Sequence, residues 1–296
     1  MEQVRHVVIV VSYNDTVSTI DFIKITSQFE CVDKIVIVDN YSTNQLYEKV
    51  NDHIKVTNLA DRVVCIKSDY NGGYAYGSNC GIKYAIEKFQ PEYISVSNSD
   101  VILNETALKK CIDFIAQHDD AGIVAPHMET PREGPMRSFW KMPSFSNVVA
   151  DNLIVLSAIS KRLMKQSFLV TGEFIPVDAI VGSYYMCLTK TMEEIGFLDE
   201  RTFLYCEENI LAQKIKRVKK QNYILPEVKY IHNHSESINK NISSVSRRLS
   251  ILHDSMRVYN KYYLRTNFFQ DLVYEITYVC GKYSYLLARK ILKIKR

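Results

Sequence analysis

Carboxylates and amides follow four short apolar runs in the first third of the chain, at the point where each run ends. The four polar clusters are Tyr13-Asn14-Asp15, Asp39-Asn40, residues 69–73 and Asn98-Ser99-Asp100. One such cluster would be ordinary, because Asp and Asn are common turn residues. Four in series favour a cleft for a polar ligand over chance turns, since their oxygens accept hydrogen bonds.

A second acidic group, Glu207-Glu208, begins a helical pattern over residues 207–220. Neighbouring side chains at a helix start diverge by about 100°, so the two carboxylates are expected to have different roles. A positioned carboxylate can remove a proton from a weak nucleophile such as a hydroxyl group, which is worth roughly 10²–10⁴-fold in rate. Two acids at a helix start also favour the helix dipole. The residues alone leave both interpretations open.

The elements that must position these clusters alternate between strands and helices in the first half of the chain. Strands are predicted at 6–12, 34–39, 63–67, 93–97 and 122–126, and helices at 17–29, 74–89 and 105–118. Such alternation indicates a parallel sheet covered on both faces. Ligands in these sheets bind beyond the carboxyl ends of the strands, so the four clusters are expected along one edge.

The second half of the chain is less regular. Residues 129–172 lose the pattern, and they are interpreted either as a mobile insertion over the site or as a long connector. Extended segments are predicted at 174–189, 222–225 and 228–232, and helices at 207–220, 244–264 and 267–293, with a short helix ending at Gly196.

Composition and cysteine spacing place the chain among ordinary folded proteins. It has 296 residues, of which 47% are apolar and 24% charged, which suits one large α/β domain with an extension or two smaller domains. Its seven cysteines are scattered singly without a CxxC pair, so free thiols in a reducing cytosol are expected. The N-terminal apolar run is too short for a signal peptide or a membrane span.

Several enzyme classes lack their expected motifs. A Rossmann dinucleotide site needs Gly-x-Gly-x-x-Gly directly after the first strand, where this sequence has Ser12-Tyr13-Asn14-Asp15. The sequence also contains no Walker phosphate loop and no His-Glu-x-x-His motif. These absences weaken the oxidoreductase, NTPase and zinc-peptidase interpretations.

The C-terminal segment is basic and amphipathic. The net charge of the whole chain is +4, whereas residues 282–296 hold six Lys or Arg and no acid. Apolar residues recur at helical spacing through this region: Phe269, Leu272, Val273, Ile276, Val279, Tyr283, Leu287 and Ile291. Residues 267–296 therefore either lie on an anionic membrane surface or form a helix that packs on its own domain with a solvated basic end.

An ordered set of segments resembles glycosyltransferase family 2, nearest to the rhamnosyltransferase-like enzymes that build bacterial capsule, O-antigen and exopolysaccharide chains. The resemblance runs in order over about residues 6–237. Besides Asn98-Ser99-Asp100, it rests on residues 8–15 (VIVVSYND), 35–42 (IVIVDNYS), 71–82 (NGGYAYGSNCGI), 177–186 (VDAIVGSYYM), 195–211 (IGFLDERTFLYCEENIL) and 226–237 (PEVKYIHNHSES).

The resemblance implies an α/β fold of GT-A type, with a Rossmann-like, mostly parallel central sheet flanked by helices and a C-terminal helical extension. The catalytic domain would span residues 1–240, with a nucleotide-binding half at 1–128 and an acceptor half at 129–240. Residues 241–296 would form the basic, amphipathic extension.

The resemblance also implies residues for the donor and for a divalent metal, Mg²⁺ or Mn²⁺. The matching donor positions are Ser12, Tyr13 and Asn14 in the nucleotide pocket, Asp39 at the pyrimidine base, Asn71 and Gly73 beside the nucleotide sugar, and Ser99 with Asp100 at the diphosphate. Asp100 and His232 match the metal-side positions, with His234 as an alternative histidine. Asn98 replaces the first Asp of the family's Asp-x-Asp motif, so a single carboxylate would share the metal with diphosphate oxygens and water.

On the acceptor side, the resemblance implies that Glu208 is the catalytic base, where the family more often has Asp. Glu207 would bind an acceptor hydroxyl or orient the site. Asp178 and Trp140 are further candidates for acceptor recognition, although an isolated Trp is more often a core residue.

The implied reaction is an inverting transfer from a UDP- or dTDP-sugar to a hydroxyl of a glycan or an undecaprenyl-diphosphate-linked acceptor. The enzyme is expected in the cytoplasm, bound peripherally to the inner face of the plasma membrane. No nucleic acid is expected as a partner, and the sequence leaves open whether the enzyme forms a homodimer. Two alternatives are a nucleotidyltransferase or nucleotide-sugar-modifying enzyme and a catalytically inactive sugar-binding scaffold.

Overall fold

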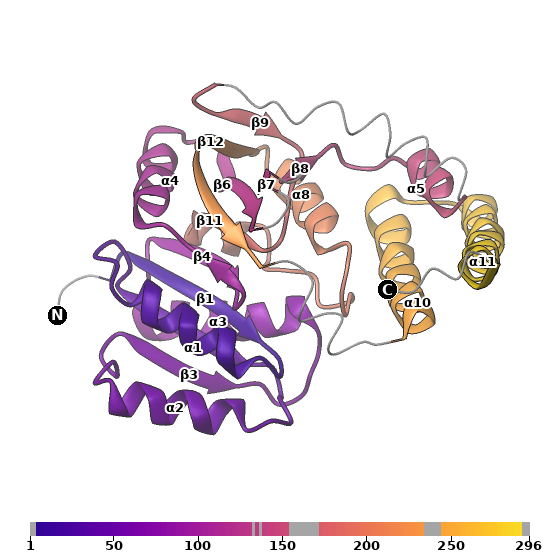
Figure 1. The fold of residues 1–296 in the computed structure, drawn as a ribbon. Helices are drawn as coiled ribbons and strands as arrows, with labels where there is room; N and C mark the ends of the chain where they lie inside the picture. Colours follow the sequence, from indigo (N-terminus) through magenta and orange to yellow (C-terminus); the bar gives the residue numbers. More distant parts are fainter. Residues whose placement is uncertain (1–3, 132–133, 136–137, 154–171, 234–243, 292–296) are drawn as a thin grey trace.

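The computed structural model describes residues 4–131, 134–135, 138–153, 172–233 and 244–291, with the backbone alone for 134–135 and 288–291. Its centre is a ten-stranded sheet whose main path runs β3-β2-β1-β4-β11-β6-β12-β5. Helices cover both faces of this sheet (Figure 1). The α/β fold predicted from the sequence is therefore confirmed.

The first half of the sheet is parallel, as the alternating pattern predicts. Strands β1 (His6–Ser12), β2 (Lys34–Asp39), β3 (Val63–Lys67) and β4 (Tyr93–Asn98) pair in parallel. Their connecting helices are α1 (Thr16–Thr26), α2 (Leu46–Val56) and α3 (Tyr74–Phe89), and α4 (Glu105–Gln117) follows β4. Helix α2 was not predicted, because only Leu46, Val50 and Ile54 are buried on it and its N-cap residue forms no side-chain hydrogen bond.

The second half of the sheet is mixed. Strand β11 (Tyr184–Leu188) lies antiparallel between β4 and β6 (Ala121–Thr130), and β12 (Gln221–His232) runs parallel to β6. The short strand β5 (Val101–Ile102) pairs antiparallel with the end of β12. The predicted parallel pairing is therefore complete in the first half, and in the second half it is kept by β6 and β12, whereas β11 and β5 pair antiparallel.

The extended run predicted at 174–189 is divided into three short strands. They are β9 (Ile175–Val177) on β12, β10 (Ala179–Ile180) on β8 (Phe139–Trp140), and β11 in the main sheet. The break comes at Asp178, whose carboxylate accepts from the backbone N–H of Met142 and whose carbonyl accepts from the Asn222 side chain. Conversely, the extended segments predicted at 222–225 and 228–232 form one strand, with a register shift between Leu225 and Lys229. A two-residue strand, β7 (Gly134–Pro135), pairs with β6.

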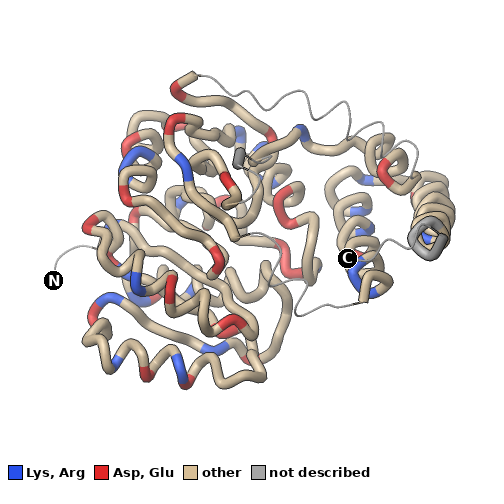
Figure 2. The backbone as a smooth tube through the Cα atoms, in the orientation of Figure 1, with Lys and Arg blue, Asp and Glu red and all other residues tan. Residues whose placement is uncertain are grey.

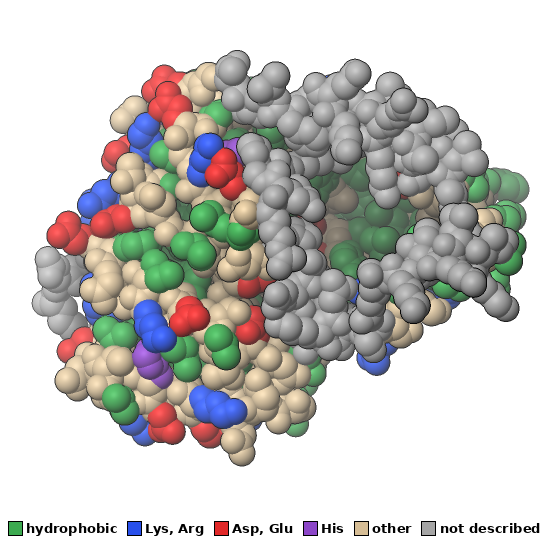
Figure 3. Space-filling model, viewed as in Figure 1, with side chains coloured by type: hydrophobic (Ala, Val, Ile, Leu, Met, Phe, Trp, Pro, Cys, Tyr) green, Lys and Arg blue, Asp and Glu red, His purple; other side chains and the backbone are tan. Residues whose placement is uncertain are grey.

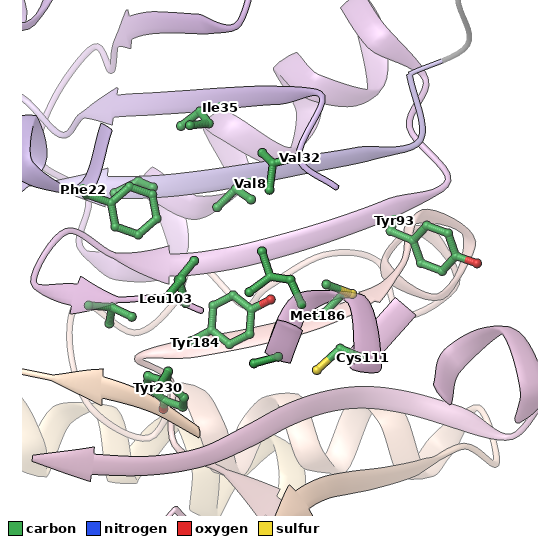
Figure 4. Packing of buried hydrophobic residues seen from close by; sticks show 14 of the residues in the cluster. Val8, Phe22, Val32, Ile35, Tyr93, Leu103, Cys111, Tyr184, Met186 and Tyr230 are labelled. Atoms are coloured by element: carbon green, nitrogen blue, oxygen red, sulfur yellow. The ribbon is translucent and has the colours of Figure 1, made fainter. Parts of the chain in front are cut away.

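Two apolar clusters lie on the two faces of the sheet. On β1, Val8 and Val10 belong to one cluster and Val7 and Ile9 to the other, because successive side chains of a strand point to opposite faces. The first cluster also contains Tyr184 and other residues from across the sheet (Figure 4). A strand buried on both faces reads as a continuous apolar run, which is why the sequence pattern located β1 well.

The C-terminal helices pack on two different parts of the protein. After the short helix α7 (Thr189–Glu194) come α8 (Glu207–Arg217), α10 (Val245–Val258), the π-helix η1 (Tyr259–Leu264) and α11 (Phe268–Ile291). Tyr259 and Tyr263 of η1 pack against Cys206 and Ile210 at the start of α8. Helix α11 lies against α5 (Phe145–Asn152), away from the central sheet (Figure 1). Within the described residues, no helix is both long enough and apolar enough to cross a bilayer.

Candidate active site

Asp100 and His232 meet at one end of the sheet, although they are 132 residues apart in sequence. His232 Nε2 lies 3.2 Å from Asp100 Oδ1, and both side chains are about nine-tenths buried, at 9% and 11% exposed. Antiparallel pairing sets this contact, because His232 on β12 faces Val101 on β5. The backbone N–H of Asn233 also donates to the Asp100 carbonyl at 3.0 Å.

Glu208 lies against the backbone of Gly182. Its Oε1 accepts a hydrogen bond from the Gly182 N–H at 3.3 Å. A Cβ atom on Gly182 would lie 3.2 Å from the same oxygen, so a larger residue would press on the carboxylate. Burial raises the pKa of the Glu208 carboxyl, which makes its ionised form a stronger base.

Glu207 is more buried than its neighbour, with 8% of its surface exposed. Burial and the nearby charge of Glu208 both raise the pKa of the Glu207 carboxyl. The two acids thus have different environments, and Glu207 favours the protonated form.

The backbone before the acidic pair is strained. Tyr205 and Cys206 both have left-handed backbone conformations, with φ of 74° and 67°. Such conformations cost non-glycine residues of the order of 1–3 kcal/mol each and often occur at functional sites. The Cys206 side chain is buried in the cluster formed with Tyr259 and Tyr263, and this packing holds the turn that begins α8.

A single dipeptide joins the two polar clusters. Gly182 contacts Glu208, and the next residue, Ser183, accepts at its carbonyl from the backbone N–H of Asn98 at 2.9 Å. The Tyr74 hydroxyl donates to the Gly182 carbonyl at 2.7 Å. Burial, followed by the charges of Glu207 and Glu208, raises the pKa of Tyr74, so this phenol stays a hydrogen-bond donor.

The loop before α3 packs directly on the segment that leads to the acidic pair. Gly73 has φ of +90°, and a Cβ atom there would lie 2.0 Å from the Phe203 carbonyl oxygen. That carbonyl accepts from the Tyr74 N–H at 3.0 Å. Asn71 Oδ1 accepts from the Gly73 N–H and from the Asn40 side chain, each at 3.2 Å. Only glycine allows this approach at position 73.

The ends of β1 and β2 are joined through one turn. The Asn14 side-chain oxygen accepts from the Thr43 N–H, and the Asp39 carboxylate accepts from the Ser42 N–H, both at 2.8 Å. Ser12 and Tyr13 lie at the same end of β1, with Ser12 buried and Tyr13 half-buried. The structure therefore brings these predicted donor residues to the carboxyl edge of the parallel strands.

The predicted acceptor residues lie beside α8. The half-buried Trp140 donates its indole N–H to Asn209 Oδ1 at 2.8 Å, one residue after Glu208. Asp178 supports the same region by accepting from the Met142 N–H at 3.0 Å. Trp140 is therefore anchored next to the helix of the acidic pair and does not belong to either face of the main core.

Sequence reasoning missed Gly182, Tyr74 and Phe203. The available signal was Gly182 itself, because a glycine inside a strand-like run often marks a break or a close approach. In the part of the chain that the structure describes, no group of three or more His, Cys, Asp or Glu residues could hold a metal. Asp100 and His232 thus form a pair of candidate ligands, and the alternative His234 lies outside the described residues.

The sequence matches the model for "Glycosyl transferase family 2" over residues 7–163. This match covers more than half of the chain. The chain belongs to glycosyl transferase family 2.

A curated protein named for glycan biosynthesis is similar to this chain in sequence. The "Low-salt glycan biosynthesis hexosyltransferase Agl10" of Haloferax volcanii is 26% identical over 211 residues, which cover 71% of this family 2 chain and 61% of the relative. The chain thus spans less than two thirds of that protein's length. The narrower resemblance to rhamnosyltransferase-like enzymes stays a prediction.

Solved glycosyltransferase structures share the fold at low sequence identity. GalNAc-T7 with UDP, GalNAc and Mn²⁺ has a TM-score of 0.60 and 16% identity, covering 78% of this chain and 44% of that one. The mannosyltransferase PcManGT of Pyrobaculum calidifontis, with GDP-Man and Mn²⁺, has a TM-score of 0.58 and 14% identity, covering 98% and 76%. S. aureus TarS with UDP has a TM-score of 0.53 and 15% identity, covering 89% and 74%. These matches confirm the GT-A-type fold.

Proposed function

We propose that this family 2 chain moves a sugar from a nucleoside diphosphate to an acceptor hydroxyl with inversion of the anomeric centre. The observation that carries the proposal is the Gly182-Ser183 dipeptide, which contacts Glu208 on one side and the start of Asn98-Ser99-Asp100 on the other. This arrangement keeps a basic carboxylate beside the residues proposed to meet the diphosphate.

Glu208 is the proposed base. It takes the proton from the acceptor hydroxyl as that oxygen forms its bond to the anomeric carbon. The bond between this carbon and the diphosphate oxygen breaks on the opposite side, so the configuration inverts. Glu207, which favours its protonated form, is proposed to donate a hydrogen bond to an acceptor hydroxyl or to orient the site.

Asp100 and His232 would hold a divalent cation, Mg²⁺ or Mn²⁺. Their contact at 3.2 Å joins a carboxylate and an imidazole that are both largely buried, and diphosphate oxygens and water could complete the shell of a hard cation. Such a cation would stabilise the negative charge on the departing diphosphate. The Mn²⁺ named with two of the structural neighbours supports this proposal.

The remaining site residues are proposed to divide between donor and acceptor. Ser12, Tyr13, Asn14 and Asp39 would bind the nucleoside, and Asn71, Gly73 and Ser99 would border the sugar and diphosphate of a UDP- or dTDP-sugar. Asp178 and Trp140 would contact the acceptor. This assignment corresponds to a nucleotide-binding half at 1–128 and an acceptor half at 129–240, followed by the extension at 241–296.

The proposed acceptor is a hydroxyl of a glycan or of an undecaprenyl-diphosphate-linked oligosaccharide in bacterial surface polysaccharide synthesis. The glycan biosynthesis named for the Haloferax volcanii relative supports a glycan acceptor. The enzyme would then work at the inner face of the plasma membrane.

A donor screen followed by a product assay tests the function. Thermal shift with UDP-, dTDP- and GDP-sugars, each with and without Mn²⁺, should show metal-dependent stabilisation by one donor class. Labelled sugar from that donor should then appear in a glycan with inverted anomeric configuration. Release of a new free nucleotide sugar, or donor binding without any transfer across a set of acceptors, would contradict the proposal.

A further inference from the structure

Helix α11 exposes a continuous apolar face. Its members, called here the α11 stripe, recur three or four residues apart and therefore share one side of the helix. Four of them are more than half exposed: Phe269 at 75%, Tyr283 at 69%, Leu287 at 59% and Ile276 at 54%. The stripe consists of Phe269, Leu272, Val273, Ile276, Val279, Tyr283 and Leu287.

The opposite side of α11 is fixed in place. Tyr274 is buried and stacks on His253 of α10. Gly281 meets α5 so closely that a Cβ atom would lie 1.8 Å from the Asn152 carbonyl oxygen, and the Asn152 side chain donates to Thr277 at 3.2 Å. Because these contacts hold the helix in one rotation, the stripe stays turned outward.

The charges of α11 are turned away from the stripe. Asp271 pairs with Lys261, and Glu275 pairs with His253 and Arg257. The charged residues among the described side chains of α11 are Asp271, Glu275 and Lys282, and each of them is partly buried, whereas the stripe residues are exposed. The right-hand edge of the molecule, where α11 lies in Figure 1, accordingly carries hydrophobic side chains in Figure 3 and is largely free of charge colours in Figure 2.

The charge of the C-terminal sequence indicates which kind of partner the α11 stripe binds. Residues 282–296 contribute six Lys or Arg and no acid. A second copy of the chain would present the same apolar, basic surface, and the described stripe offers it no carboxylate. Anionic phospholipid complements both features, since acyl chains accept the stripe and headgroups attract the basic residues.

We propose that the α11 stripe is a docking surface for an anionic phospholipid bilayer. The helix lies in the plane of the membrane with its apolar face in the headgroup region, while α5 and α10 hold it from the protein side. This inference does not rest on the proposed transfer reaction, because it concerns a surface remote from the acidic pair. Membrane binding and glycosyl transfer can therefore fail separately.

Vesicle flotation of the full chain tests the proposal. We expect binding to vesicles of phosphatidylglycerol and phosphatidylcholine in equal parts, and weaker binding to phosphatidylcholine alone. Ile276→Asp should weaken binding to the anionic vesicles by about tenfold or more, because a charge replaces an inserted apolar side chain. Val56→Asp is the matched control, since Val56 is 84% exposed on α2 and its replacement should leave binding unchanged.

A fluorescent probe on α11 distinguishes insertion of this helix into the bilayer from binding of the protein to vesicles through another surface. Cys280 is the exposed cysteine of the chain and lies within the α11 sequence. A polarity-sensitive dye on Cys280 should shift its emission to the blue when anionic vesicles are added. Absence of flotation, equal flotation of the two Asp variants, or a dye that stays in water would each overturn the proposal. A dimer in sedimentation velocity that Ile276→Asp dissociates, with no vesicle binding, would assign the stripe to a second copy and also overturn it.

Discussion

The backbone N–H of Gly182 donates to Oε1 of Glu208 at 3.3 Å, which ties the proposed base to the strand beside Asn98-Ser99-Asp100. The carbonyl of the same glycine accepts a hydrogen bond from the Tyr74 hydroxyl. One residue, Gly182, thus connects the base with the start of α3, and its neighbour Ser183 connects to the end of β4. Small changes at Gly182 should alter the catalytic rate more than the affinity for the donor.

Replacing Gly182 by Ala should displace the Glu208 carboxylate. The new Cβ would lie 3.2 Å from Oε1 and 3.4 Å from Cγ of Glu208, and a misplaced catalytic group costs roughly tenfold to a hundredfold in rate. We expect kcat to fall by that factor while the donor Kd is unchanged, as measured by initial rates and calorimetry. The control is Gly196→Ala, where no atom lies within 4 Å but φ is +68°, so it should cost about 1 kcal/mol in stability and keep its kcat. Similar kcat losses in both variants would contradict this role.

The two acids should respond differently to amide substitution. Glu208→Gln should fold, bind donor and lose transfer by roughly 10²–10⁴-fold, because the base is removed. Glu207→Gln should keep activity within several-fold at neutral pH, because glutamine resembles the protonated glutamate that burial and the Glu208 charge favour. Single-turnover rates at saturating donor measure both effects. Near-normal transfer by Glu208→Gln would rule out its assignment as base.

The raised pKa of Glu207 should also appear in the pH dependence of stability. Its folded-state pKa lies above the ordinary value of 4.5, so the folded protein holds this proton more tightly than the unfolded chain does. The resulting stabilisation is complete below the unfolded pKa and is lost as pH rises through the folded pKa. Between about pH 5 and about pH 8, the melting temperature of the wild type should therefore fall more than that of Glu207→Gln, because the pKa of Glu207 rises from 4.5 to about 8 on folding. If the melting temperatures of the two proteins depend on pH in the same way, the pKa of Glu207 is not raised in the folded protein.

Metal-dependent nucleotide binding should require Asp100 and depend on His232. Calorimetry of UDP with and without Mn²⁺ should show tighter binding with the metal for the wild type. Asp100→Ala should abolish this gain, and His232→Ala should reduce it, because each removes a proposed ligand. His118→Ala serves as the control, since His118, the C-cap residue of α4, bonds to the Phe114 carbonyl. An undiminished Mn²⁺ effect in Asp100→Ala would exclude this residue as a ligand.

Local patterns determined much of the fold from the sequence alone. The strands at 6–12, 34–39 and 63–67 and the helix at 74–89 have the predicted bounds, because buried strands and helices leave continuous or periodic apolar patterns. The sequence also located the polar clusters at the strand ends and, through its ordered motifs, the family. Helix α2 was missed: Leu46, Val50 and Ile54 recur at helical spacing, but only these three residues of the helix are buried and its N-cap residue forms no side-chain hydrogen bond.

Only the tertiary structure decided which of these residues meet. Asp100 reaches His232 through antiparallel pairing of β5 with β12, and Gly182 reaches Glu208 because β11 inserts next to β4. The outward rotation of the α11 stripe likewise depends on Gly281 packing against Asn152. Periodicity specifies which side of an element is apolar, but strand order and helix docking depend on contacts between residues far apart in sequence. The sequence therefore supplied the reactive groups, and long-range packing set the distances between them.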